Sequence, residues 1–66
     1  GDAIRAIVQA LPDKQREVFV LYELEQMNGE EIAALVGVPV GTIWTRLHHA
    51  RKRFKALWVK RHGGRS

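Results

Sequence analysis

The part of the sequence that most constrains the fold is residues 28–54, which consist of a short helix, a break and a longer basic helix. The break falls at residues 37–39, where Gly37 can adopt the positive φ that a tight turn between helices requires. Four residues earlier, Ala33 is small enough to let two helices cross closely. Six residues after the glycine, Ile43 returns to the shared core. This spacing predicts a helix-turn-helix, and it makes DNA the first partner to consider.

The charge distribution of the chain favours a polyanionic partner. Residues 1–31 contain three basic and seven acidic residues, a net charge of −4, whereas residues 32–66 contain eight Lys or Arg and no acid. Such an asymmetry would orient the C-terminal half toward a polyanion. A solvated basic tail is the alternative, but these charges fall on a patterned helix beside a turn.

Length and composition exclude several classes of protein. Sixty-six residues make one small domain with a small core. The absence of cysteine excludes disulfides and zinc–thiolate sites, and it suits a reducing, cytosolic location. No run approaches the roughly 18 apolar residues of a membrane span, and no signal-peptide pattern opens the chain. Because the chain begins with Gly1 rather than Met, we expect a fragment of a longer protein.

An all-α fold of four helices without strands is predicted. The first helix covers about residues 2–10, where apolar residues recur at helical spacing. Leu11 and Pro12 interrupt it, because proline lacks the donor that a continuing helix needs. The second helix then runs from about residue 13 to residue 26.

The third and fourth predicted helices form the helix-turn-helix at the C-terminal end of the domain. Asn28 caps the third, two-turn helix and forms a capping-box-like pair with Glu31. The fourth is a long basic recognition helix over about residues 40–62, and two glycines follow it. We therefore expect a helix-turn-helix domain over residues 1–62 and a disordered tail over residues 63–66.

A step of about 100° per residue sorts the fourth helix into two faces. The stripe that must pack on the other helices is apolar: Ile43, Leu47, Ala50, Phe54 and Leu57, with Trp58 at its edge. The opposite face is polar: Thr45, His48, His49 and Lys52, with Trp44 and Lys55 on one shoulder and Arg46, Arg51 and Arg53 along the flanks. A recognition helix contacts base edges with residues near its N-terminal end. The candidates for base contacts are therefore Trp44, Thr45, His48 and His49.

Cations beside this face, together with the backbone amides at the start of the helix, suit phosphate groups. The candidates for phosphate contacts are Gly41, Thr42, Arg46, Arg51, Lys52 and Arg53. Two of these interpretations have alternatives: Trp44 could cover the rim of the core, and the hydroxyls of Thr42 and Thr45 could simply face solvent. No metal site is predicted, because adjacent histidines diverge by about 100° on a helix and no further ligand follows.

Several segments of the chain form a familiar pattern. They are Leu11-Pro12, Gln15-Arg16-Glu17-Val18-Phe19, Glu30-Glu31-Ile32-Ala33, Gly37-Val38-Pro39-Val40-Gly41-Thr42-Ile43, Arg46-Leu47-His48 and Ala50-Arg51-Lys52-Arg53. Together they resemble region four of bacterial sigma factors, in particular the extracytoplasmic-function branch of the sigma-70 family. The match runs from Leu11 to Leu57 without a gap. A generic helix-turn-helix would not require the Leu-Pro start and the Pro-Val-Gly-Thr helix opening together.

The resemblance implies a function and a set of partners. Region four docks on the flap of the RNA polymerase β subunit and contacts the −35 promoter element with its last long helix. Positions that match Trp44, Thr45, His48 and His49 commonly contact bases or the adjacent backbone in family members. The implied partners are double-stranded promoter DNA, the RNA polymerase core and an anti-sigma factor, and no cofactor is implied. Region two, which melts the −10 element, is missing from this sequence.

Two positions depart from the family pattern. Family members usually have a cation at the position of Trp44 and often arginine at that of His49. Arginine makes a bidentate contact to guanine that is worth roughly 1–3 kcal/mol of discrimination, and tryptophan cannot make it. We therefore expect a −35 preference unlike the common guanine-rich sequence, with a thymine methyl against Trp44. Alternatively, Trp44 contacts an anti-sigma protein.

Two other functions remain open at this point. The domain could be chiefly a protein-interaction module in which Phe19 and Val20 contact the β flap, while Trp44 or Trp58 contacts an anti-sigma protein. It could also be the effector domain of a response regulator, which ends in a similar four-helix module. An enzyme is not expected, because no triad-like nucleophile or glycine-rich phosphate loop is present and the core is too small for a closed pocket.

Overall fold

Four α-helices and one π-helical turn follow one another in residues 1–63, the part of the chain that the computed structural model describes. They are α1 (Asp2–Ala10), α2 (Asp13–Phe19), the π-helical turn η1 (Val20–Leu24), α3 (Gly29–Val36) and α4 (Val40–Arg61). No strand occurs in these residues, so the predicted all-α fold is confirmed. Of the tail predicted over residues 63–66, residues 64–66 lie outside the described part.

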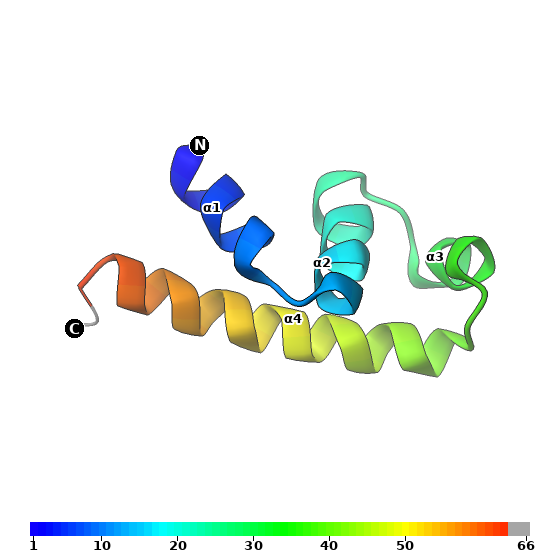
Figure 1. The fold of residues 1–66 in the computed structure, drawn as a ribbon. Helices are drawn as coiled ribbons and strands as arrows, with labels where there is room; N and C mark the ends of the chain where they lie inside the picture. The colour runs from blue at the N-terminus through cyan, green and yellow to red at the C-terminus, as the bar shows by residue number, and fades with distance from the viewer. Residues whose placement is uncertain (64–66) are drawn as a thin grey trace.

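The long helix α4 lies along one side of the molecule. At 1.5 Å per residue its 22 residues span about 33 Å, close to the longest extent of the molecule, 38 Å. Figure 1 shows α1 over the C-terminal half of α4, α3 beside its first turns, and α2 between them. The opposite side of α4 is covered by no other helix of residues 1–63. None of the described helices combines the length and apolar character that crossing a bilayer requires.

The helix α3 begins and ends as the sequence predicts. The amide of Glu31 donates to Oδ1 of Asn28 (2.8 Å) and the amide of Asn28 donates to Oε1 of Glu31 (2.9 Å), so the capping box is complete. At the other end, Gly37 has a φ of 84°, and its amide donates to the carbonyl of Ala33 (2.8 Å). Since side chains rarely tolerate this φ, the glycine fixes the turn into α4.

The second predicted helix does not continue as an α-helix to residue 26. It is α-helical only through Phe19 and continues as η1, at whose end the amide of Glu25 donates to the carbonyl of Val20 (2.9 Å). Gln26 then adopts a φ of 60°, which is uncommon for a residue other than glycine. The wider i→i+5 turn rotates the residues that follow it, an effect that apolar spacing over residues 13–26 does not reveal.

The core consists of two clusters of buried side chains. One contains Val8, Leu11, Phe19 and Ala50, and the other contains Val18, Ile32, Ile43 and Leu47. The adjacent residues Val18 and Phe19 belong to different clusters, so α2 is buried on two sides, toward α1 and toward α3. Both clusters include residues of α4, which confirms its predicted apolar stripe.

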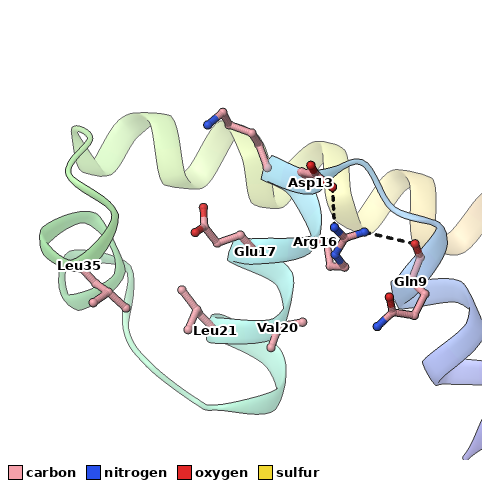
Figure 2. A pocket seen from close by; sticks show the side chains of 8 residues that line it. Gln9, Asp13, Arg16, Glu17, Val20, Leu21 and Leu35 are labelled. Carbon is pink, nitrogen blue, oxygen red and sulfur yellow. Dashed lines mark hydrogen bonds and ion pairs between the residues drawn. The ribbon is translucent and has the colours of Figure 1, made fainter.

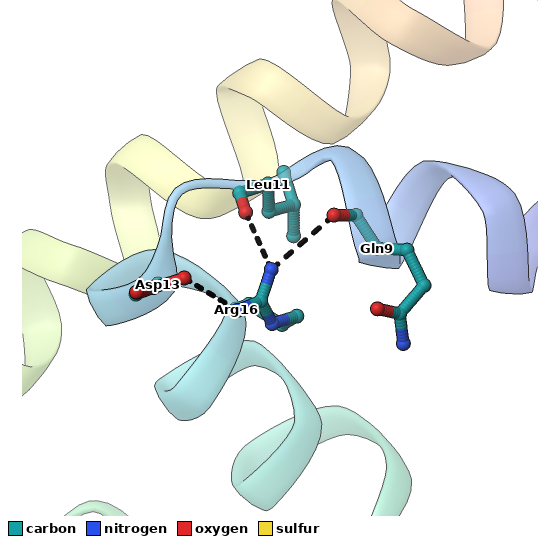
Figure 3. Close-up of polar contacts among 4 residues, drawn as sticks. All are labelled: Gln9, Leu11, Asp13 and Arg16. Atoms are coloured by element: carbon teal, nitrogen blue, oxygen red, sulfur yellow. Dashed lines mark hydrogen bonds and ion pairs between the residues drawn. The ribbon is translucent and has the colours of Figure 1, made fainter.

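A guanidinium joins the end of α1 to the start of α2. Nη1 of Arg16 donates to the carbonyls of Gln9 (3.2 Å) and Leu11 (3.0 Å), while Nη2 lies 2.5 Å from Oδ1 of Asp13 (Figure 3). The last carbonyls of a helix have no partner within the helix. Arg16 therefore satisfies two backbone acceptors at the joint that places α1 over α4.

Candidate nucleic-acid interface

The uncovered side of α4 is polar. We call it the outward face, and its exposed residues are Thr45, His48, His49 and Lys52. The residues that alternate with them, Ile43, Leu47 and Ala50, are at most 2% exposed. The helix is therefore oriented as its sequence pattern predicts, and four polar side chains share one open surface.

Three of the predicted base-contact residues lie together on this face. Oγ1 of Thr45 donates to the carbonyl of Gly41 (3.1 Å), which leaves the hydroxyl oxygen free to accept a hydrogen bond. The rings of His48 and His49 lie 5.7 Å apart and are tilted by 57°, so they face different directions. His49 also borders a shallow groove with Gln15 and Arg53. The face thus offers both donors and acceptors to a ligand.

The start of α4 offers backbone amides, but not the pair that the sequence suggests. No side chain caps this end, where Pro39 is the N-cap residue. The amide of Thr42 donates to the carbonyl of Pro39 (3.0 Å), so it is not available to a phosphate. Within residues 1–63 the amides of Val40 and Gly41 donate to no acceptor. These two amides lie at the positive end of a 22-residue helix.

The cations of α4 differ in what surrounds them. Nη2 and Nε of Arg51 lie 2.6 and 2.7 Å from Oε2 of Glu23, and its guanidinium lies over the ring of Tyr22 at 5.3 Å. Arg51 therefore points toward η1. By contrast, the exposed Lys52 and Arg53 have no acidic partner in the described residues, whose two ion pairs are those of Arg51 and Arg16.

Arg46 is half-buried at the edge of the apolar stripe. Its Nη1 is buried and has no hydrogen-bond partner, and the same is true of Oε1 of Gln15 on α2. A buried polar atom without a partner costs about 1–3 kcal/mol. Arg46 is thus placed beside the core as well as beside the outward face.

Trp44 lies at the edge of the outward face and is only partly covered by other residues. Its ring and that of Tyr22 pack in a T-shaped arrangement, with 5.7 Å between centroids and 84° between planes. It also lies against Gly29, the buried first residue of α3. Nevertheless, 45% of Trp44 is exposed. The side chain therefore covers the rim of the core and still presents surface to a ligand.

The residues predicted to bind a protein partner are placed in different environments. Phe19 is buried, 8% exposed, and its ring stacks on Phe54 at 5.1 Å, so the prediction that it faces a partner is wrong. Val20 is half-buried and lines a groove of about 680 Å³ between α2 and α3, where Figure 2 shows Leu21 and Leu35 on either side. Trp58 is 39% exposed near the end of α4.

A helix-turn-helix whose second helix presents an open, cationic face is the architecture of a DNA-binding domain. Comparison with known families identifies which one. Residues 1–54 match the family model of sigma-70, region 4, and the chain belongs to this family.

Similar curated proteins are sigma factors. The chain is 35% identical over 55 residues to the ECF RNA polymerase sigma factor SigW of Bacillus subtilis, a match that covers 83% of this chain and 29% of the relative. It is 42% identical over 55 residues to the RNA polymerase sigma-E factor of Streptomyces coelicolor, with coverage of 83% and 31%. It is 45% identical over 49 residues to the RNA polymerase sigma-E factor of Streptomyces avermitilis, a match that covers 74% of this chain and 27% of the relative. The chain thus spans less than a third of the length of these relatives.

No solved structure matches the chain significantly. Membership of the sigma-70 region 4 family nevertheless decides between two of the interpretations that the sequence leaves open. It favours a sigma-factor domain over the effector domain of a response regulator.

Proposed function

We propose that this chain recognises the −35 promoter element as the C-terminal domain of an extracytoplasmic-function sigma factor, and so supports transcription initiation. The observation that carries the proposal is the outward face of α4, where polar residues and unpaired cations lie on an uncovered helix. The major groove of B-DNA, about 12 Å wide, admits such a helix. The relatives, which are named RNA polymerase sigma factors, support promoter DNA as the ligand.

Within this proposal the side chains divide into two groups. Thr45, His48 and His49 contact base edges, with Trp44 at the edge of the groove. The phosphate contacts come from Lys52, Arg53, Arg46 and the amides of Val40 and Gly41. Arg46 is retained because Nη1 is its only guanidinium nitrogen that is buried without a partner. Arg51 and the amide of Thr42 are left out, since both have partners inside the domain.

A salt titration with matched variants tests the DNA-binding role. Binding of the chain to a promoter duplex should weaken with salt, with a slope of log K against log[salt] of about −0.9 for each phosphate contacted. Lys52→Gln and Arg53→Gln should each make this slope shallower by about 0.9. Lys14→Gln removes the same charge from an exposed residue of α2 and should leave the slope unchanged. A flat plot for the unsubstituted chain would refute the phosphate contacts.

For the protein partner we propose the RNA polymerase core, contacted through the β flap in the bacterial cytoplasm. The groove between α2 and α3 favours this second interaction, because Leu35 beside it is 64% exposed and no residue of α4 lines it. A partner seated there would leave the outward face of α4 free for DNA. We further propose that an anti-sigma protein contacts the exposed Trp58.

A pull-down with a β-flap fragment tests the groove. Leu35→Glu should abolish retention, because it places a charge beside Val20 and Leu21, the other two apolar residues of a groove that is otherwise lined by polar side chains. Ala34→Glu adds the same charge at the preceding, exposed residue of α3 and should retain the flap. If the unsubstituted chain is not retained even at high concentration, the flap assignment is wrong.

A further inference from the structure

The ring of Trp44 is held between two other elements of the domain. Gly29, the first residue of α3, is buried, and a β-carbon added there would lie within 3.0 Å of Cζ2, Cη2 and Cε2 of Trp44. Real side chains do not approach so closely, so only glycine leaves room for the indole. Tyr22 of η1 packs against the ring in a T-shaped arrangement from another element.

The contacts continue beyond the indole. Tyr22 lies under the guanidinium of Arg51 (5.3 Å), and Arg51 is paired with Glu23. We call this set the Trp44 flank: Glu23, Arg51, Tyr22, Trp44 and Gly29. It connects η1, α3 and α4, so the indole is held against two elements other than its own helix. The side chains of His48 and His49, by contrast, make no hydrogen bond with the described residues.

We propose that Gly29 and Tyr22 are positioning residues that hold the exposed part of Trp44 as a fixed apolar surface, which selects a thymine through its C5-methyl group. This inference rests on the proposed function. An indole has a single donor and cannot make the bidentate contact to guanine, whereas the thymine methyl in the major groove suits an apolar surface. A side chain that is already fixed loses less conformational entropy when it binds, which favours a specific contact.

The structure also makes the effect of Gly29 depend on Trp44. At the first position of a helix alanine has no backbone penalty, and replacing glycine there usually stabilises a protein through the unfolded state. With Trp44 present, the added β-carbon must displace the indole. Gly29→Ala should therefore lower Tm by several degrees in the unsubstituted chain and leave it unchanged or raise it in the Trp44→Ala background. Equal shifts in both backgrounds would contradict the contact.

A scan with deoxyuridine tests the proposed base contact. The sequence preferred by the unsubstituted chain is first selected from a random duplex library, and each thymine is then replaced in turn by deoxyuridine, which lacks the methyl. At one position we expect a loss of affinity of about fourfold, equivalent to ~0.8 kcal/mol for one methyl group. This loss should disappear in Trp44→Ala, in Gly29→Ala and in Tyr22→Leu. Tyr22→Phe keeps the aromatic ring and should retain the loss.

The possible outcomes separate the inference from the proposed function. If no deoxyuridine weakens binding, or if the loss persists in Gly29→Ala and Tyr22→Leu, the inference is wrong although the chain still recognises a promoter. If the unsubstituted chain selects no sequence, the proposed function itself fails. Because Tyr22→Leu leaves α3 unaltered, it supplies the same readout should Gly29→Ala fail to fold.

Discussion

The two flanks of α4 contain the same kind of side chain and use it differently. Arg51 is held by Glu23 and Tyr22, whereas Arg53, only two residues later, has no acidic partner in the described part of the chain. A separation of about 200° around the helix places these arginines beside different neighbours. The comparison shows that the element packed beside a flank decides which cations of that flank are available to DNA. The number of cations on the helix does not decide it.

The neighbours themselves explain the difference. Beside Arg51, the π-helical turn contributes a carboxylate and an aromatic ring, which together accept a guanidinium. Beside Arg53, the start of α2 contributes Gln15, an amide without charge. One flank is therefore neutralised within the domain, and the other keeps its charge for a polyanion.

The largest effect is expected from reversing the charge of the flank that contains Arg53, together with the neighbouring Lys52. Lys52→Glu combined with Arg53→Glu should weaken binding to duplex DNA about 100-fold at low salt, on the basis of about tenfold for each reversed phosphate contact. Fluorescence anisotropy with a labelled duplex measures the loss. The free energy of unfolding should change little, since both side chains are exposed. A loss below about threefold would mean that this flank does not face DNA.

A smaller effect, on stability rather than on DNA binding, is expected on the flank that contains Arg51. Arg51→Gln removes an ion pair and a cation–π contact, together about 1 kcal/mol, so Tm should fall by about 4–8 °C. The slope of log K against log[salt] for DNA should stay the same. Glu23→Gln should lower Tm similarly, and the double variant should lose less than the sum. An altered DNA slope for Arg51→Gln would show that Arg51 also contacts phosphate.

The smallest loss of stability is expected at Arg46, which borders both the core and the flank that contains Arg53. Arg46→Met replaces a buried donor without a partner by an apolar chain of similar length, so Tm should not fall and should rise if the cost of that donor is relieved. The DNA slope should nevertheless become shallower by about 0.9, because one phosphate contact is lost. Thermal unfolding and a salt titration of the same sample measure both quantities. A large fall in Tm would reveal a partner for Nη1.

Local signals were sufficient to predict the helix-turn-helix itself. The capping box of Asn28 and Glu31 and the left-handed Gly37 each depend on a few neighbouring residues, so sequence reasoning located both ends of α3. The apolar stripe of α4 follows from helical spacing alone, and its buried residues are the ones predicted. Each of these features can be predicted from nearby residues alone, without knowing where another helix lies.

Features that depend on the packing of distant segments were not predictable in this way. Residues 23 and 51 form their ion pair across 28 positions, and only the placement of η1 beside α4 brings them together. The prediction that Phe19 faces a partner is wrong because periodicity does not show that α2 is buried on two sides. The requirement for glycine at position 29 is likewise visible only once the indole of Trp44 lies against it.

The uncapped start of α4 has a thermodynamic consequence. Two amides of its first turn, those of Val40 and Gly41, have no hydrogen-bond acceptor among the described residues. An anion that settles there completes the helix terminus in the same step in which it binds. Binding of an anion and the stability of that first turn are then thermodynamically coupled, and protection of these amides from hydrogen exchange would report on both.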